Sequence, residues 1–199
     1  MKLLYSIFFL LLSSNCSYAG GNPSAGKSKI IICTGCHESD GNSTNPAYPK
    51  LAGQGEAYLT KQIRDFKSGA RVEEHMTSMV KAINESDVEN IAAYFSSQER
   101  QASRQKTTTT LSGKQIFNHG IKLKGVPACA SCHGPSAHGI TGKRYPLLAG
   151  QHKSYIIKML QAFRDNRRHN DPDKQMRLIA KKLNDKEIEA ISAYLAELP

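Results

Sequence analysis

The strongest constraint on this chain is that its second half repeats its first. The heptapeptide YPKLAGQ at 48–54 returns as YPLLAGQ at 145–151, a spacing of 97 residues. Further matching pairs keep this register, at spacings of 97 and then 100 residues: Tyr58 with Tyr155, Phe66 with Phe163, Met76 with Met176, Asn84 with Asn184, and Ala93-Tyr94 with Ala193-Tyr194. The pattern indicates a tandem duplication of one small module.

Each copy contains one CxxCH box, CTGCH at 33–37 and CASCH at 129–133. A helical CxxC places both thiols on one face, with the imidazole directly behind them. Zinc sites, dithiol redox pairs and framework disulfides use the same residue types. A histidine in the same place in both copies favours covalent attachment of c-type haem. The predicted attachment residues are Cys33, Cys36, Cys129 and Cys132, with His37 and His133 as iron ligands.

The first residues have the pattern of a secretory signal. Lys2 precedes an apolar run from Leu3 to Leu12, and small residues follow near Ala19. We therefore expect residues 1–19 to be cleaved and the mature protein to be periplasmic. The apolar run is too short for a transmembrane helix, and no later run is long enough. Lipidation at Cys16 is the alternative fate of this segment.

Apolar spacing predicts an all-α module. Helices are expected over 56–67, ended by Gly69, and over 153–164 in the second copy. The expected N-caps are Ser24 and Ser112 before the boxes, and Asn84 and Asn184 before the closing helices. No segment shows the alternation of a half-buried strand.

Domain limits follow from the repeat. We expect the first domain at 20–100, a polar linker at 101–112 and the second domain at 113–199. Domains of this size bury little core of their own, so a large apolar cofactor in each would complete the interior. An aromatic content of 7% agrees with that interpretation.

The repeat also selects a second iron ligand in each copy. Met76 and Met176 are the methionines in register, so they are the predicted sixth ligands. Met79 has an isoleucine as its counterpart and is expected in the core, while His75 is expected at the surface. The other candidates are expected to pack or to lie at the surface: Met159, His119, His138, His152 and His169.

Iron bound by histidine and methionine has both axial positions closed. A closed iron offers no place for a substrate such as peroxide or nitrite. The pattern therefore predicts an electron carrier that works by outer-sphere transfer, not an enzyme.

These residues resemble the dihaem cytochrome c4 family, two class I cytochrome c domains in tandem. The resemblance covers the mature chain through the boxes, the heptapeptides, the paired methionines and IAAYFSSQ at 91–98. It implies that Pro49 and Pro146 offer their carbonyls to the ring N–H groups of the two box histidines. It also implies a periplasmic carrier that feeds a terminal oxidase, with two covalently bound haems near the interface of a fixed domain pair.

Two other functions remain open at this point. A dedicated cytochrome subunit of a larger dehydrogenase uses the same tandem domains. A small dihaem peroxidase or reductase would need one iron to lose its sixth ligand.

Charge divides the two copies. Residues 20–104 contain ten basic and ten acidic side chains, whereas residues 113–199 contain fifteen and seven, a net charge of +8. The basic residues considered for docking are Arg167, Arg168, Lys181 and Lys182. They either form a solvated face or bind an acidic surface, on a redox partner such as a membrane-bound oxidase or on an anionic membrane. Nucleic acid is excluded as a partner by export.

Overall fold

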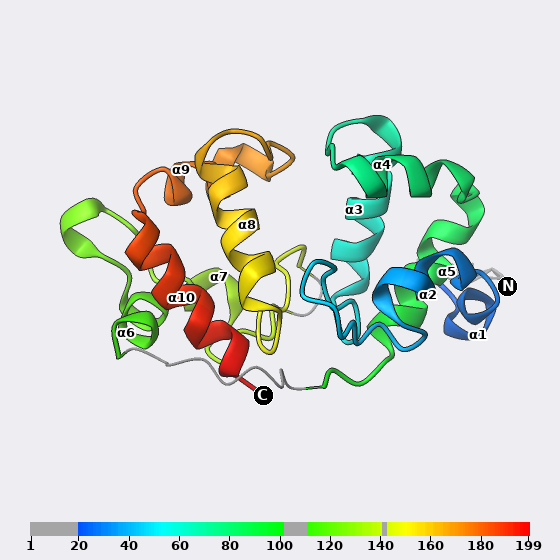
Figure 1. Cartoon of the computed structure of the whole chain (residues 1–199), viewed down its shortest axis with the longest axis horizontal. Coiled ribbons are helices and arrows are strands. Elements are labelled where there is room, and N and C mark those ends of the chain that lie inside the picture. Colours follow the sequence, from blue (N-terminus) through cyan, green and yellow to red (C-terminus); the bar gives the residue numbers. More distant parts are fainter. Residues whose placement is uncertain (1–19, 102–110, 141–142) are drawn as a thin grey trace, which may run out of the picture.

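The computed structural model describes residues 20–101, 111–140 and 143–199. They form two helical lobes, the first domain at the right of Figure 1 and the second at the left. The expected signal peptide at 1–19 and most of the expected linker at 101–112 lie outside the described residues, so the division into domains stays a prediction.

Helices account for the regular structure of the described residues, which contain no β-strand beyond one isolated bridge between Ile121 and Val126. The first domain contains α1 (Pro23–Lys27), α2 (Ile31–His37), α3 (Glu56–Ser68), α4 (Glu74–Met79), η1 (Val80–Ala82) and α5 (Glu85–Ser96). The second contains α6 (Leu111–His119), η2 (Lys122–Lys124), α7 (Ala130–His133), α8 (Lys153–Arg164), η3 (Pro172–Lys174), α9 (Gln175–Ala180) and α10 (Asp185–Glu197). The predicted all-α class is confirmed.

The helices with clear local signals form where the sequence predicts them. Gly69 takes the left-handed conformation at φ 79° and ends α3. Asn184 and Glu187 form a complete capping box at the start of α10. Asn84 holds the N-cap position of α5, but its side-chain amide donates to Asp87 at 3.4 Å and caps no backbone group.

The predicted caps before the boxes are wrong. Asn22 is the N-cap of α1, because its Oδ1 accepts the backbone N–H groups of Ser24 and Ala25 at 2.9 and 3.2 Å. Pro23 then fills the first helical position, where a missing N–H costs nothing. Ser112 lies inside α6, and the first CxxCH box is carried by the separate helix α2.

Each domain closes around one tight helix crossing. A Cβ on Gly26 of α1 would lie 2.0 Å from the Asn90 carbonyl oxygen of α5, and one on Gly113 of α6 would lie 2.2 Å from the Ala190 oxygen of α10. Only glycine permits this approach. Each domain also has its own cluster of buried apolar side chains, with Phe95 at the centre of one and Phe117 in the other.

The two domains are joined by reciprocal hydrogen bonds from the repeated heptapeptides. The Gln54 amide accepts from the Leu147 N–H at 2.8 Å and donates to the Leu147 carbonyl at 3.0 Å. The Gln151 amide makes the same pair of bonds with Lys50, at 2.9 and 3.0 Å. Because the partners occupy equivalent positions in the two copies, the interface has approximate two-fold symmetry.

The expectation that His152 lies at the surface is wrong. Its side chain is 5% exposed, and its Nε2 donates to the Ser43 carbonyl of the first domain at 2.9 Å. Its Nδ1 is buried and has no hydrogen-bond partner among the described residues. Burial lowers the pKa of His152, and the nearby charges of Lys50 and Arg100 lower it further, against the raising effect of the Ser43 bond. His152 is therefore a neutral residue of the domain interface.

This burial predicts a pH-dependent stability. Unfolded His152 gains a proton as the pH falls through about 6.5, whereas the folded form, with its lowered pKa, does not. The free energy of unfolding should therefore fall below that pH, measured by denaturant titration at several pH values. His152→Gln, which keeps a donor for Ser43 but does not titrate, should flatten this dependence. The exposed control His169→Gln should leave it unchanged; equal slopes for the two variants would contradict the prediction.

Candidate functional site

One large cavity of about 920 Å³ extends through both domains and their interface. Ligand cavities in proteins typically measure about 300–1,000 Å³. Its walls are mostly apolar; among the side chains that line it are Leu59, Phe66, Ile91, Leu160, Phe163 and Leu195. Neither domain fills its own interior, so each has room for a large, mostly apolar group.

The four box cysteines all face this cavity. Cys33 and Cys36 come from α2, Cys129 directly precedes α7, and Cys132 lies within it. All four are free and half-buried. Burial raises the pKa of Cys33, with a smaller contribution from Cys36, and burial likewise raises that of Cys129; both reach about 11. The thiols of Cys33 and Cys129 are therefore neutral, and none of the four cysteines is used in a framework disulfide.

The box histidines are fixed in one tautomer. His37 Nδ1 lies 2.8 Å from the Pro49 carbonyl oxygen, and His133 Nδ1 lies 3.0 Å from that of Pro146, as the resemblance implied. A carbonyl oxygen only accepts, so Nδ1 carries the proton in both rings and Nε2 keeps its lone pair. Burial lowers both pKa values, which the carbonyl bonds partly oppose. Each ring is thus a neutral, oriented ligand at the cavity wall.

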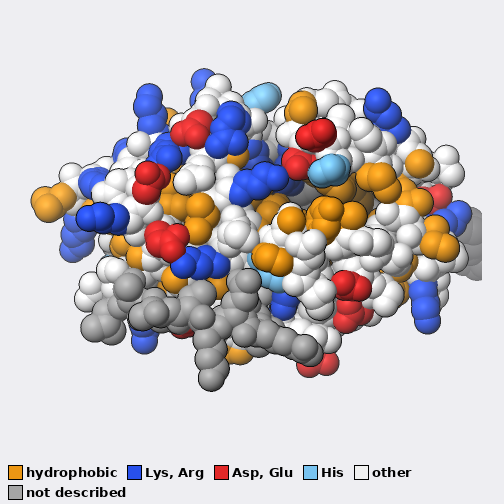
Figure 2. Space-filling view, in the orientation of Figure 1, with side chains coloured by type: hydrophobic (Ala, Val, Ile, Leu, Met, Phe, Trp, Pro, Cys, Tyr) orange, Lys and Arg blue, Asp and Glu red, His pale blue; other side chains and the backbone are white. Residues whose placement is uncertain are grey.

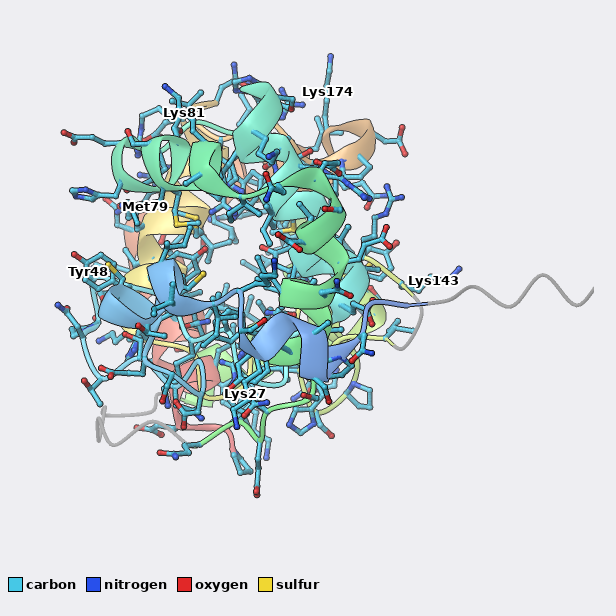
Figure 3. The ribbon with its side chains drawn as sticks, turned by 90° about the vertical axis from the view of Figure 1, so that its right-hand side faces the viewer. Lys27, Tyr48, Met79, Lys81, Lys143 and Lys174 are labelled. Carbon is cyan, nitrogen blue, oxygen red and sulfur yellow. The ribbon has the colours of Figure 1, made fainter. Side chains whose placement is uncertain are left out.

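Both predicted methionine ligands also reach the cavity. Met76 is on α4 and Met176 is on α9, and both side chains are half-buried. Met79 is not a core residue as predicted: it is the last residue of the short helix α4, which has no buried residue, and it is 43% exposed. Figure 3 shows Met79 and Tyr48 on the same side of the first domain, and both border the cavity. His75 is exposed, as expected.

The two methionine helices are held differently. Glu73 caps α4, accepting the Met76 N–H at 3.2 Å, and its other carboxylate oxygen pairs with Lys158 of the second domain at 3.2 Å. In the second copy, Asp171 accepts the Arg177 N–H and also binds the Arg177 side chain at 2.7 Å, all within one domain. Of these two capping carboxylates, Glu73 therefore contacts the other domain, whereas Asp171 contacts its own.

Two buried arginines meet where the cavity crosses the interface. Arg71 and Arg168 stand 97 positions apart and stack in the same way, each 4.5 Å from the ring centre of Phe66 or Phe163. They are 7% and 9% exposed. Arg71 donates to Tyr155 and Arg168 to Tyr58, both at 3.2 Å across the interface. The burial of Arg168 corrects the expectation that it belongs to a basic surface.

These arginines bear on whether the site fits haem. Their hydrogen-bond partners among the described residues are neutral: Gln62, Tyr58, Tyr155, Met159 and Asn170. A buried cation is costly without a counter-charge. The two propionates of a haem would supply that charge at this end of the cavity, while thiols, imidazole and thioether face its apolar part. The residues present fit one haem in each domain.

A zinc site is a poorer fit. The described residues contain no group of three or more His, Cys, Asp or Glu side chains placed to hold a metal ion. A CxxCH box supplies only three donors, whereas a structural zinc site uses four.

Sequence reasoning missed the residues that join the domains. The repeat contained a signal for them, because Arg71 and Arg168 share the spacing of 97 residues that relates Gln54 to Gln151. Met159 packs at this interface, where its sulfur lies 3.1 Å from Arg168 Nη1. His119, His138 and His169 are exposed, as expected.

Comparison with known proteins gives matches along nearly the whole chain. The cytochrome c family model matches residues 31–99 and again 111–199. A cytochrome c4 of Pseudomonas aeruginosa is 42% identical over 198 residues, which cover 99% of this chain and 98% of that protein. A thiosulfate dehydrogenase electron acceptor of Thiomonas intermedia is 34% identical and covers 96% of this chain and 87% of its own. The crystal structure of reduced recombinant cytochrome c4 from Pseudomonas stutzeri superimposes with a TM-score of 0.86 at 41% identity, covering 90% of this chain and all of that one.

The cap of α4 gives a stability test. Glu73→Ala removes both the cap and the ion pair, and should lower the free energy of unfolding by about 1 kcal/mol. Lys158→Ala removes only a partly exposed ion pair and should cost less than about 0.5 kcal/mol. Denaturant titration of the two variants measures the difference. Equal losses would show that the interdomain pair, rather than the cap, holds the helix that carries Met76.

Proposed function

The chain belongs to the cytochrome c family, as a dihaem carrier of the cytochrome c4 kind with two covalently attached haem c groups, and from this we propose its ligands, location and partners. We propose that it accepts electrons from a periplasmic or membrane donor and passes them to a terminal oxidase. No helix of the described residues is long and apolar enough to cross a membrane.

The observation that carries the proposal is the pairing of one imidazole with one thioether in each copy. His37 and Met76 line the cavity in the first domain, and His133 and Met176 do so in the second. Haem supplies the one-electron Fe(III)/Fe(II) couple when it is bound. If these side chains held the iron of a bound haem, neither domain would leave a position for substrate, which favours transfer over catalysis.

The chain's own residues tune and protect this couple. The Pro49 and Pro146 carbonyls hold the histidine rings with Nε2 directed away from the carbonyl bond. The apolar walls would limit the access of water to a bound haem, and a soft thioether ligand would favour the reduced iron. Arg71 and Arg168 place positive charge where the two halves of the cavity meet.

Charge indicates which surface meets an electron partner. Figure 2 shows more Lys and Arg side chains over the left-hand lobe, the second domain, than over the right-hand one. Arg167 is 60% exposed, and Lys181 and Lys182 are exposed as well. We propose that these three residues, without the buried Arg168, steer an acidic partner.

A second candidate is a dedicated cytochrome for one dehydrogenase. The likeness to the thiosulfate dehydrogenase electron acceptor of Thiomonas intermedia favours it. Co-purification of a catalytic subunit with the native protein would support this role over that of a free carrier. The peroxidase or reductase alternative has less support, because a methionine faces the cavity in both domains.

Replacing the methionines tests the ligand assignment. The ferric protein should show a weak sulfur-to-iron absorption band from two low-spin haems. Met76→Ala and Met176→Ala should each remove about half of this band, since each copy contributes one thioether ligand. The visible spectrum of the purified holoprotein measures it during a redox titration.

The control is Met79→Leu, which keeps the volume of the side chain but cannot bind iron. It should leave the band at full strength. If it halves the band while Met76→Ala does not, Met79 is the ligand. A band of half strength in the unmodified protein would move the assignment toward the enzyme alternatives.

The docking proposal makes a kinetic prediction. Replacing Arg167, Lys181 and Lys182 by Gln should slow association with an acidic redox partner and flatten its dependence on salt. Stopped-flow electron transfer at several ionic strengths measures both quantities. A matched triple change in the first domain, at Lys27, Lys29 and Lys81, should alter them much less. Identical effects of the two triple variants would contradict a docking site on the second domain.

A further inference from the structure

A loop of the second domain has no equivalent in the first. Gly26 and Gly113 make the same helix contact in the two copies and are 87 residues apart, whereas Cys33 and Cys129 are 96 apart. The second domain therefore has nine more residues between this glycine and its box, divided between a longer helix α6 and a longer segment after it. That segment forms a loop that projects at the far left of Figure 1. We name residues 120–126 the KLK loop.

The base of the KLK loop is firmly built. Ile121 and Val126 exchange two backbone hydrogen bonds, of 2.9 and 3.1 Å, and Val126 is 3% exposed in the core of the domain. Gly125 turns the chain at φ 61°, and its carbonyl accepts from Lys182 at 2.8 Å. Lys124 binds the Glu187 carboxylate at 2.7 Å. The loop is held outward by these contacts.

The tip carries an apolar side chain between two cations. Leu123 is 103% exposed, although the other two apolar residues of the loop pack into the domain. Lys122 and Lys124 flank it, and exposed Lys181 and Lys182 lie on the segment that contacts the base. A single exposed leucine is ordinary. A fully exposed leucine on a projection with a firmly bonded base, and with a lysine on either side in the sequence, has the composition of an interfacial membrane anchor.

We propose that the KLK loop binds the surface of an anionic phospholipid bilayer. Leu123 enters the boundary between headgroups and acyl chains, and Lys122 contacts the anionic headgroups. The anchoring is weak and reversible, because one leucine and its neighbouring lysine contribute it.

A bilayer fits these observations better than an acidic protein does. No residue from 119 to 126 lines the cavity, whereas an electron partner has to approach the cavity to exchange electrons. The tip is also convex and has one apolar side chain, while protein docking sites bury larger and flatter areas. Anchoring here would hold the second domain at the membrane and leave the cavity lining free for a redox partner. That orientation rests on the proposed carrier function; the lipid binding does not.

The test is sedimentation of the purified holoprotein with large vesicles. Vesicles of phosphatidylcholine with about one quarter phosphatidylglycerol should bind the protein at low salt, and vesicles of phosphatidylcholine alone should bind it much less. Leu123→Ala should weaken binding to the anionic vesicles about fivefold or more. Lys122→Gln should weaken it about fivefold. The matched control is Leu178→Ala, because Leu178 is an exposed leucine of the same domain, at 59%.

Three outcomes would overturn the proposal: no binding to anionic vesicles, unchanged binding of Leu123→Ala, or equal weakening by Leu178→Ala. Sensitivity to Lys122→Gln with none to Leu123→Ala would show binding by charge alone and would overturn the insertion of Leu123. Electron transfer to a soluble acceptor without vesicles should be unchanged in Leu123→Ala. Loss of that transfer would show that Leu123 takes part in electron exchange with a partner, whatever the result of the lipid-binding assay.

Discussion

The structure depends on a hollow that neither domain fills with its own side chains. Each half of the chain is a small set of helices around a gap lined by two thiols, an imidazole and a thioether, and the two gaps join into one cavity. Domains of this size bury too little apolar surface to be stable with an unfilled interior of that extent. The haem in each domain is therefore part of the hydrophobic core as well as the redox centre, which couples folding to cofactor attachment.

The same cavity explains why the two domains pack against each other. Residues of both domains line it, so the interface between them forms part of its wall. The reciprocal bonds of Gln54 and Gln151 fix that arrangement through backbone groups, which makes it insensitive to the identity of the side chains they meet. Arg71 and Arg168 follow the same two-fold symmetry, because each guanidinium stacks on the equivalent phenylalanine of its own domain, Phe66 or Phe163.

Two-fold symmetry at the interface coexists with differences at the periphery. The second domain carries the excess positive charge and the KLK loop, whereas the first is nearly neutral. The first methionine helix is capped by Glu73, which also contacts Lys158 of the other domain, and the second is held within its own domain. A duplicated module thus retains equivalent redox sites while its two copies face different surroundings.

The sequence by itself determined the duplication, the all-α class and the residues that face the cavity. These follow from short-range patterns: CxxCH brings two thiols and an imidazole together within two turns of helix, and the repeat selects Met76 and Met176. Helices α3 and α8 were predictable for the same reason, because apolar spacing and Gly69 act locally.

Only the tertiary structure decided the burial of Arg168 and His152 and the exposure of Met79. The burial of Arg168 and His152 depends on groups of the first domain that approach from about a hundred residues away, and a basic residue carries no local sign of that approach. The sequence also did not show that α1 and α2 are two separate helices. Asn22, and not Ser24, is the N-cap of α1. Local patterns predicted the ligands, and long-range packing decided their surroundings.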